Sequence, residues 1–138
     1  MNTMMRNLTL LVPMALAMAG CATMTDAQRL AQIQSYAGDP VKQIHYFAPQ
    51  GWEEVDENHI ILSMRPSETY LVRLSGPCLD YDNGAAVMLV TNTAGWIQNK
   101  FDYVSFGREG FRCRIEEIRP VDVAAMRAAN KPTKANET

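Results

Sequence analysis

Apolar and polar positions along the chain follow a helical period near both ends and shorter, strand-like runs between them. Residues 27–37 carry apolar side chains at helical spacing, and the Thr25–Gln28 segment at their start matches a capping box. Gly38 and Pro40 end this pattern, because glycine suits the position after a helix and proline cannot continue one. The pattern therefore predicts a helix that begins after Thr25 and ends before Gly38.

Short apolar runs separated by turn residues fill the stretch from Val41 to Ile118. Their spacing is typical of an antiparallel meander or a barrel-like sheet, not of alternating βαβ units. Residues 86–90 are apolar on both faces, which predicts a central strand there. The predicted strands cover residues 42–47, 52–55, 59–64, 69–74, 86–91, 101–106 and 113–118.

A second helical pattern follows the last predicted strand. Asp122 is placed to cap it, and Val123 and Met126 would face the core. Residues 131–138 are polar and are expected to form a flexible tail. The whole pattern predicts an α+β fold, mainly antiparallel β, with one helix before and one after the sheet, in a single globular domain over residues 25–130.

Residues 1–20 have the layout of a secretory signal peptide. Arg6 supplies the positive charge, and the almost wholly apolar stretch 8–19 is shorter than the roughly 20 residues that a membrane-spanning helix needs. Residues 16–21, with the sequence LAMAGC, resemble the lipobox of bacterial lipoproteins, in which small residues precede a cysteine that receives lipid. An alternative is ordinary cleavage at the Ala-Met-Ala motif of residues 17–19, which would leave an unlipidated protein.

The chain has three cysteines, an odd number for a secreted protein. If Cys21 carries lipid, Cys78 and Cys113 remain as a natural pair, and an oxidising compartment would join them in a disulfide. Closing a loop of about 36 residues would stabilise the fold by roughly 3.5–4 kcal/mol in the chain-entropy model. The rival interpretation is redox catalysis or a zinc site, but the chain has no Cys-X-X-Cys motif and no histidine close to either cysteine in sequence.

Resemblance to bacterial lipoproteins implies that Cys21 takes a thioether-linked diacylglycerol and an N-linked acyl chain such as palmitate. More than one chain gives stable anchoring, whereas a single chain gives only reversible membrane binding. Residues 21–24 would then be a lipidated tether of at most about 14 Å between the membrane and the first helix. Ala22 is not the aspartate that retains enteric lipoproteins in the inner membrane. We therefore expect a location in the bacterial cell envelope, at the outer membrane and facing the periplasm.

Charge bears on the class of partner. The formal net charge is −2 at pH 7, and the charged residues are spread along the chain without a basic stripe. Proteins that bind nucleic acid concentrate positive charge on one face or along one helix. The partners expected for this chain are therefore the membrane, through the N-terminal lipid, and an envelope protein, with no nucleic acid among them.

Asp102 is the most interesting acid among the candidate catalytic groups, because aromatic residues flank it in a predicted strand. An aspartate that faces the core needs a partner, and three arginines are candidates: Arg73, Arg112 and Arg114. A structural ion pair or an exposed position is the simpler interpretation. Neither glutamate doublet, 53–54 or 116–117, forms a catalytic dyad by itself, since neighbours on a strand point to opposite faces.

The other candidate motifs are incomplete. Asp80–Gly84 resembles the start of a calcium loop, but an EF-hand needs glycine at its sixth position and glutamate at its twelfth, and this chain has neither there. His45 and His59 lie in predicted strands, and no Gly-X-Ser-X-Gly elbow supplies a nucleophile for them. Trp52 and Tyr70 are interpreted as core residues rather than as a binding groove. We expect no metal and no cofactor.

Short motifs are spread over nearly the whole of the mature chain, in this order: Tyr46-Phe47, Arg65-Pro66, Gly76-Pro77-Cys78, Phe101-Asp102, Cys113-Arg114-Ile115 and Ile118–Asp122. Together with the lipobox, they resemble a family of small proteobacterial lipoproteins that is known only as a domain of unknown function. The resemblance supports the fold boundaries and the pairing of Cys78 with Cys113. It implies no catalytic residues.

The functional hypothesis from the sequence is a lipid-anchored envelope protein that acts as a non-enzymatic binding or accessory module. Two alternatives remain open. The chain could inhibit a cell-wall or host hydrolase with Gly107–Gly110 as the inserting loop, by analogy with the build of small disulfide-linked inhibitor lipoproteins. It could instead be a small envelope hydrolase that uses Asp102 together with a glutamate.

Overall fold

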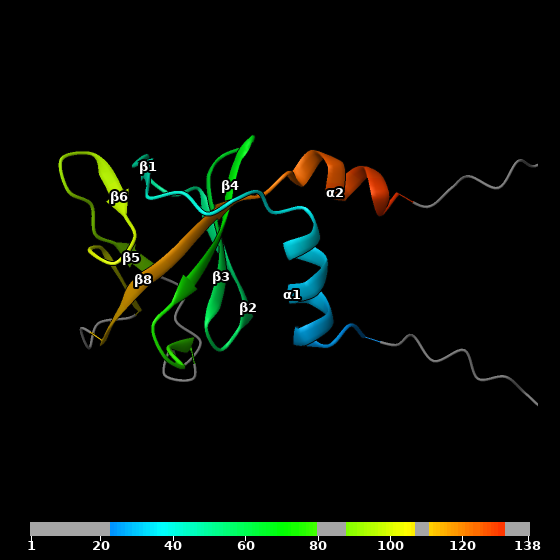
Figure 1. The fold of residues 1–138 in the computed structure, drawn as a ribbon, viewed down its shortest axis with the longest axis horizontal. Coiled ribbons are helices and arrows are strands. Elements are labelled where there is room, and N and C mark those ends of the chain that lie inside the picture. Colours follow the sequence, from blue (N-terminus) through cyan, green and yellow to red (C-terminus); the bar gives the residue numbers. More distant parts are fainter. Residues whose placement is uncertain (1–22, 80–87, 107–110, 132–138) are drawn as a thin grey trace, which may run out of the picture.

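The computed structural model describes residues 23–79, 88–106 and 111–131 (Figure 1). These residues form two helices and eight strands, which are, in chain order, α1 (Asp26–Ser35), β1 (Gln43–His45), β2 (Gly51–Asp56), β3 (His59–Arg65), β4 (Glu68–Leu74), β5 (Met88–Val90), β6 (Trp96–Gln98), β7 (Tyr103–Phe106), β8 (Phe111–Pro120) and α2 (Val123–Ala129).

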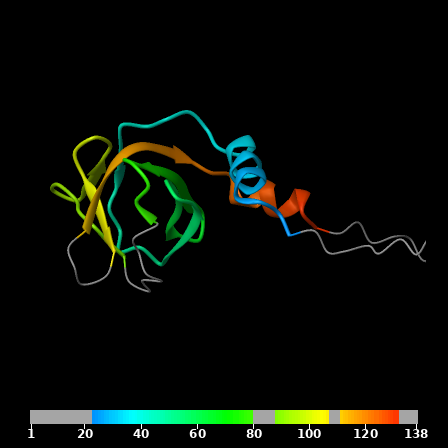
Figure 2. The ribbon, with the colours of Figure 1, turned by 90° about the horizontal axis from the view of Figure 1, so that it is seen from below.

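Six of the strands form one antiparallel sheet in the order β2-β3-β4-β8-β7-β5, and β1 pairs with β6 in a separate two-stranded ribbon. The large sheet curls into a half-barrel, and α1 and α2 lie together at one end of the molecule (Figures 1 and 2). Helix α1 precedes the sheet and α2 follows it. The predicted fold class is therefore confirmed.

The core has two parts, one on each face of the curled sheet. Strand β3 alternates strictly, so that Ile60, Leu62 and Met64 face the inside of the half-barrel and are at most 1% exposed. On the outer face a smaller cluster joins the sheet to α1, and it consists of Ile33, Val55, Leu71 and Val121. Burial of such side chains stabilises the fold by about 1.5–3 kcal/mol each.

Local capping fixes where the two helices begin. The side chain of Thr25 accepts a hydrogen bond from the backbone of Gln28, whose own side chain accepts one from the backbone N–H of Thr25, so the predicted capping box is present. Asp122 caps α2 by accepting a hydrogen bond from the backbone N–H of Ala125 at 2.9 Å, also as predicted.

Cys78 and Cys113 are paired at disulfide distance, with Cα atoms 6.1 Å apart. Both are buried, at 1% and 3% exposed. The pair joins the segment after β4 to strand β8, as the cysteine count predicts.

One strand prediction is wrong in detail, and one short strand has no counterpart among the predictions. The apolar run at 88–90 forms β5 at the edge of the sheet rather than a central strand, and its Leu89 is 62% exposed. Met88 and Val90 pack against the core, so the apolar run reflects one buried face and one exposed leucine. Strand β6 was not predicted, because its three residues follow directly on a tight turn in which Ala94 and Gly95 both have positive φ.

Candidate functional surface

Asp102 is the buried acid that the sequence singles out, and the structure places it in the turn before β7 rather than in a strand. Its carboxylate accepts hydrogen bonds from the backbone N–H of Gln98 at 2.7 Å and from the hydroxyl of Thr91 at 2.9 Å. These two donors satisfy a side chain that is only 4% exposed. Asp102 therefore holds the turn together from inside.

The predicted arginine partners of Asp102 are wrong, for a reason of geometry. Asp102 lies opposite Ile115 of β8: the backbone N–H of Ile115 donates to the carbonyl of Asp102 at 2.9 Å. Ile115 is buried, whereas its neighbours along the strand point to the other face. On that face Arg114 pairs with Glu116 at 2.8 Å, while Arg73 lies 3.9 Å from Glu117.

Further backbone bonds fix the turn between β6 and β7. The N–H of Lys100 donates to the carbonyl of Ile115 at 2.6 Å, and the N–H of Asn99 donates to the carbonyl of Lys42 at 3.0 Å. The backbone of Lys100 has a φ of 65°, a conformation that residues other than glycine rarely adopt. Such a backbone conformation is kept only where surrounding contacts hold it in place. Here the hydrogen bonds to β1, to β8 and to Asp102 hold it.

This fixed turn presents an aromatic ring to solvent. Phe101 is 73% exposed, the highest value among the large apolar side chains that the structure describes as exposed. Tyr103 is 37% exposed, and Leu89 lies on the same outer face of the β5–β7 pair. Exposed apolar side chains that gather in one patch are a feature of binding surfaces, whereas single ones are ordinary.

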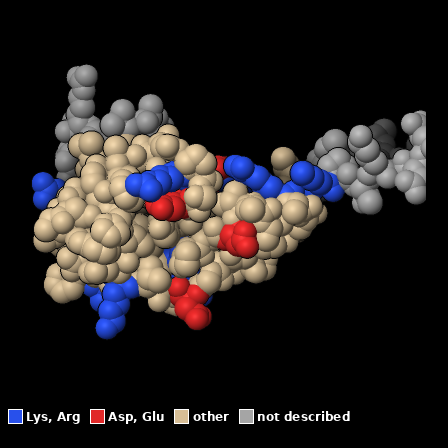
Figure 3. Space-filling model, turned by 90° about the horizontal axis from the view of Figure 1, so that it is seen from above, with Lys and Arg blue, Asp and Glu red and all other residues tan. Residues whose placement is uncertain are grey.

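Exposed cations lie on the elements that meet at this turn. Lys42, Lys100 and Arg112 are exposed, and none of them forms an ion pair with another described residue. At the end of the molecule away from the helices, the described part visible in Figure 3 shows Lys and Arg atoms without Asp or Glu atoms beside them. We call this region the Phe101 surface; it consists of Lys42, Leu89, Lys100, Phe101, Tyr103 and Arg112.

The two histidines have local structural partners. The ring of His45 lies against that of Trp96, with centroids 3.6 Å apart, on the β1–β6 ribbon. Nδ1 of His59 lies 2.8 Å from Oδ1 of Asp56, whose carboxylate also accepts the backbone N–H groups of the β2–β3 turn. Neither histidine contacts Asp102 in the described structure.

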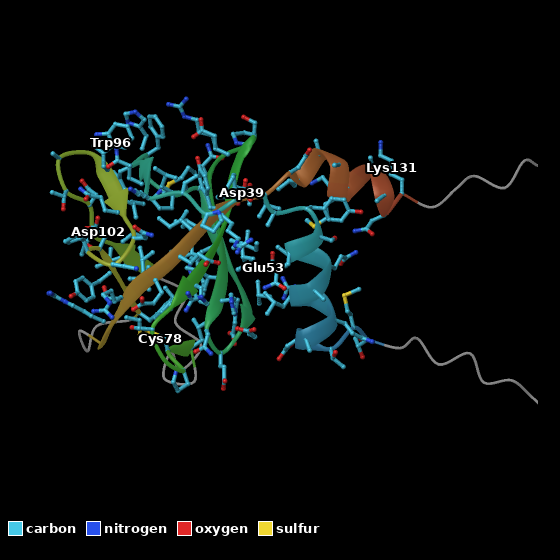
Figure 4. The ribbon with its side chains drawn as sticks, in the orientation of Figure 1. Asp39, Glu53, Cys78, Trp96, Asp102 and Lys131 are labelled. Atoms are coloured by element: carbon cyan, nitrogen blue, oxygen red, sulfur yellow. A yellow bond between two sulfur atoms is a disulfide. The ribbon has the colours of Figure 1, made fainter. Side chains whose placement is uncertain are left out.

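The candidate glutamates face different partners. Glu53 pairs with Arg29 of α1 and lies between that helix and the sheet (Figure 4). Glu116 and Glu117 pair with arginines on β8. The hydrogen bonds described for the Asp102 carboxylate come from Thr91 and Gln98 and from no glutamate.

Trp52 and Tyr70 are core residues, as interpreted from the sequence. The ring of Trp52 packs on that of Phe106, with centroids 5.1 Å apart, and both Trp52 and Tyr70 pack against the inner core cluster. Burial raises the pKa of the Tyr70 phenol above its ordinary value of 10.0, and the carboxylate of Glu68 adds to this shift.

Several predicted features lie outside the described residues: Cys21, Asp80–Gly84 and Gly107–Gly110. Within the described ranges, no three His, Cys, Asp or Glu side chains come together as metal ligands would. In the same part of the chain, neither helix has the length and hydropathy needed to cross a bilayer.

The sequence did not point to Phe101 as a functional residue. The available signal was its place between a lysine and an aspartate at the start of a predicted strand, but that signal does not show that the ring is exposed. Only the bonds that the turn makes to Lys42 and Ile115, both distant in sequence, place the ring outside.

A curled antiparallel half-barrel, with two helices at one end and an exposed aromatic ring on a fixed turn at the other, defines a small α+β domain. The chain belongs to DUF6491, a family of unknown function whose model matches residues 4–137. This match confirms the resemblance to a family of unknown function. No curated protein and no solved structure matches the chain.

Proposed function

We propose that the protein is a lipid-anchored binding module of the bacterial cell envelope, attached through Cys21 and contacting a protein partner through the Phe101 surface. The observation that carries this proposal is the exposed ring of Phe101 on a turn fixed by the buried Asp102. Rigid aromatic side chains bury a large area on binding at a small cost in conformational entropy, and they dominate the binding energy of many interfaces.

The arrangement of the elements suits a tethered module. The first described residues lead directly into α1, so a lipid on Cys21 would attach the molecule by its helical end. Asp102 and its turn lie at the opposite end, beside β5 and β6 (Figure 4). A domain held in this way directs the Phe101 surface away from the bilayer and towards periplasmic proteins.

Charge around the ring indicates the chemistry of the partner. Lys42, Lys100 and Arg112 carry positive charge that no described acid compensates. Complementary potentials steer association and select among partners. We therefore expect a protein partner with an apolar pocket for Phe101 and acidic residues around that pocket.

The inhibitor alternative draws on the same turn. Protein inhibitors of hydrolases present a preorganised segment, because rigidity lowers the entropic cost of binding. Gly107–Gly110, the loop that the sequence suggested for this role, lies outside the described residues, whereas the Phe101 turn is rigid and exposed. The hydrolase alternative has no comparable support, because the buried carboxylate of Asp102 accepts hydrogen bonds from the Thr91 hydroxyl and the Gln98 backbone.

Site-specific photo-crosslinking in the native envelope tests the contact surface. A photoreactive residue at position 101 should give one discrete protein adduct, whereas the same residue at the exposed Ala124 of α2 should not. Charge reversal by Lys42→Glu with Lys100→Glu should abolish the adduct. A discrete adduct from position 124 alone, or adducts unchanged by charge reversal, would place the contact elsewhere.

Two further measurements test the anchor and the inhibitor alternative. Cys21→Ala should move the protein from the membrane fraction to the soluble periplasm, and continued membrane attachment would refute the lipid anchor. Slowing of a muramidase by the wild-type protein, lost in Phe101→Ala, would favour inhibition over an accessory role.

A further inference from the structure

A cleft of about 340 Å³ lies between the two helices and the outer face of the sheet. Its apolar wall consists of Ile33 of α1, Ile61 of β3, and Val123 and Met126 of α2. This volume falls within the range of about 300–1,000 Å³ that small-molecule sites occupy. Such sites combine apolar with polar lining groups, and here polar and charged side chains line the rest of the cleft.

One of the polar groups is the hydroxyl of Thr69. Thr69 lines the cleft and is 8% exposed; only Asp102 and Thr69 are buried polar residues in the described structure. Asp102 has two hydrogen-bond donors, whereas the Thr69 hydroxyl bonds to no other described side chain or backbone group. This hydroxyl is not one of the buried, unpartnered side-chain atoms of the described residues, so it is open to the cleft and can form a hydrogen bond with a molecule bound there.

The cleft also carries one uncompensated positive charge. Arg29 is neutralised, because its guanidinium pairs with the carboxylate of Glu53 and donates to the carbonyl of Glu54 at 2.8 Å. Arg127, at the end of α2, lines the same cleft and forms no ion pair with a described residue. The charge balance of the cleft therefore suits a ligand with a single negative charge.

The apolar side chains of helix α2 face the cleft and are only partly buried. It has only seven residues and none of them is buried, although Val123 and Met126 turn towards the outer core cluster. A hydrogen bond of 3.1 Å between the side chains of Gln32 and Asn130 links it to α1. Because so short a helix draws its stability from tertiary packing, a ligand that filled the cleft would complete the burial of its apolar face.

We infer that this cleft is a binding site for a fatty-acid-like carboxylate, with its acyl chain between α1, α2 and the sheet and its carboxylate at Arg127. The apolar wall accommodates the chain, the guanidinium pairs with the carboxylate, and the Thr69 hydroxyl supplies a hydrogen bond. This site lies at the helical end of the molecule and does not depend on the Phe101 surface.

Isothermal titration calorimetry with decanoate, kept below its micelle concentration, tests the inference. The full chain is used with Cys21→Ser, so that neither its own lipid nor detergent competes. Decanoate should bind one to one. Acetate, which lacks the chain, and decyltrimethylammonium, which has the chain with the opposite charge, should not bind.

Matched variants locate the site. Arg127→Gln should weaken decanoate binding about tenfold, the loss expected for one charge-assisted hydrogen bond. Lys131→Gln removes an exposed cation that lies close to Arg127 in sequence, does not line the cleft and has no ion-pair partner among the described residues, and it should leave binding unchanged. Thr69→Val, which keeps the shape of the side chain, should weaken binding, and its circular dichroism should match that of the wild type.

Three outcomes would overturn the inference. Equal binding of decanoate and decyltrimethylammonium would show that charge plays no part. Equal losses in Arg127→Gln and Lys131→Gln would show that the ligand does not pair with Arg127 in the cleft. Binding of a single-chain phospholipid without binding of decanoate would exclude a free carboxylate as the occupant. None of these results bears on the Phe101 surface, so the two proposals fail separately.

Discussion

Asp102 and Gln98 hold each other through two reciprocal hydrogen bonds. The backbone N–H of Gln98 donates to the carboxylate of Asp102 at 2.7 Å, and the backbone N–H of Asp102 donates to the carbonyl of Gln98 at 3.0 Å. The two bonds close the turn that carries Lys100 and Phe101. The acid with the strongest catalytic promise in the sequence is therefore the group that shapes the exposed turn.

Removal of this carboxylate should destabilise the fold. In Asp102→Ala, the N–H of Gln98 and the hydroxyl of Thr91 lose a buried acceptor. We expect a loss of about 1–3 kcal/mol in the free energy of unfolding, measured by urea denaturation. Asp102→Asn keeps one acceptor oxygen and should lose less. A change below about 0.5 kcal/mol in Asp102→Ala, the size of an ordinary surface effect, would contradict this role.

Two leucines give a matched test of the core. Leu62 is 0% exposed inside the half-barrel, whereas Leu89 is 62% exposed on the edge strand. Leu62→Ala leaves a cavity and should cost about 2–5 kcal/mol in the free energy of unfolding. Leu89→Ala should stay within about 0.5 kcal/mol. Similar losses of unfolding free energy in both variants would mean that Leu89 on β5 is buried in solution.

The cysteine pair should contribute to stability without affecting the anchor. Replacement of both Cys78 and Cys113 by alanine opens a link between positions 35 residues apart in sequence and should cost about 2–5 kcal/mol. Thermal denaturation with and without reductant measures this loss. Cys21→Ala, the third cysteine substitution, should leave the melting temperature of the purified domain unchanged. If reductant lowers the melting temperature of the alanine pair as much as that of the wild type, the pair is not the source of the effect.

Tyr70 should make the fold sensitive to alkaline pH. Burial, with the carboxylate of Glu68 as the second cause, raises its pKa, so the folded state favours the neutral phenol. The resulting stabilisation is fully present below the unfolded pKa of about 10 and is lost as pH rises through the higher folded value. Urea midpoints measured from about pH 8 to 11 should therefore fall less steeply in Tyr70→Phe than in the wild type. Identical slopes would rule out this contribution.

Features fixed by neighbouring residues could be predicted from the sequence. The capping box at Thr25 involves residues three positions apart, and Asp122 caps the helix that begins at the next residue. Both bonds depend on short-range geometry, so the residue types alone indicate them. The alternation that defines β3 is equally local.

Features that depend on distant partners could not be predicted. Asp102 was expected beside an arginine, but its donors are a hydroxyl 11 residues earlier and a backbone N–H four residues earlier. Strand β6 exists because Ile97 pairs with Ile44, more than fifty positions away. The exposure of Phe101 follows from the hydrogen bonds of Asp102 and from the pairing of β6 with β1, since the turn between β6 and β7 takes its shape only after these contacts form.

The position of the Phe101 turn at the end opposite α1 also sets a mechanical axis. If the chain is anchored at its N-terminal side and held by a partner at Phe101, any movement between membrane and partner pulls along the length of the molecule. The backbone hydrogen bonds from Lys100 to Ile115 and from Asn99 to Lys42 join the Phe101 turn to the rest of the domain and would carry this force. Strand β8, which contains Ile115, is also joined to Cys78 by the cysteine pair. The cysteine pair thus keeps β8 joined to the segment after β4 when such a load acts on the domain.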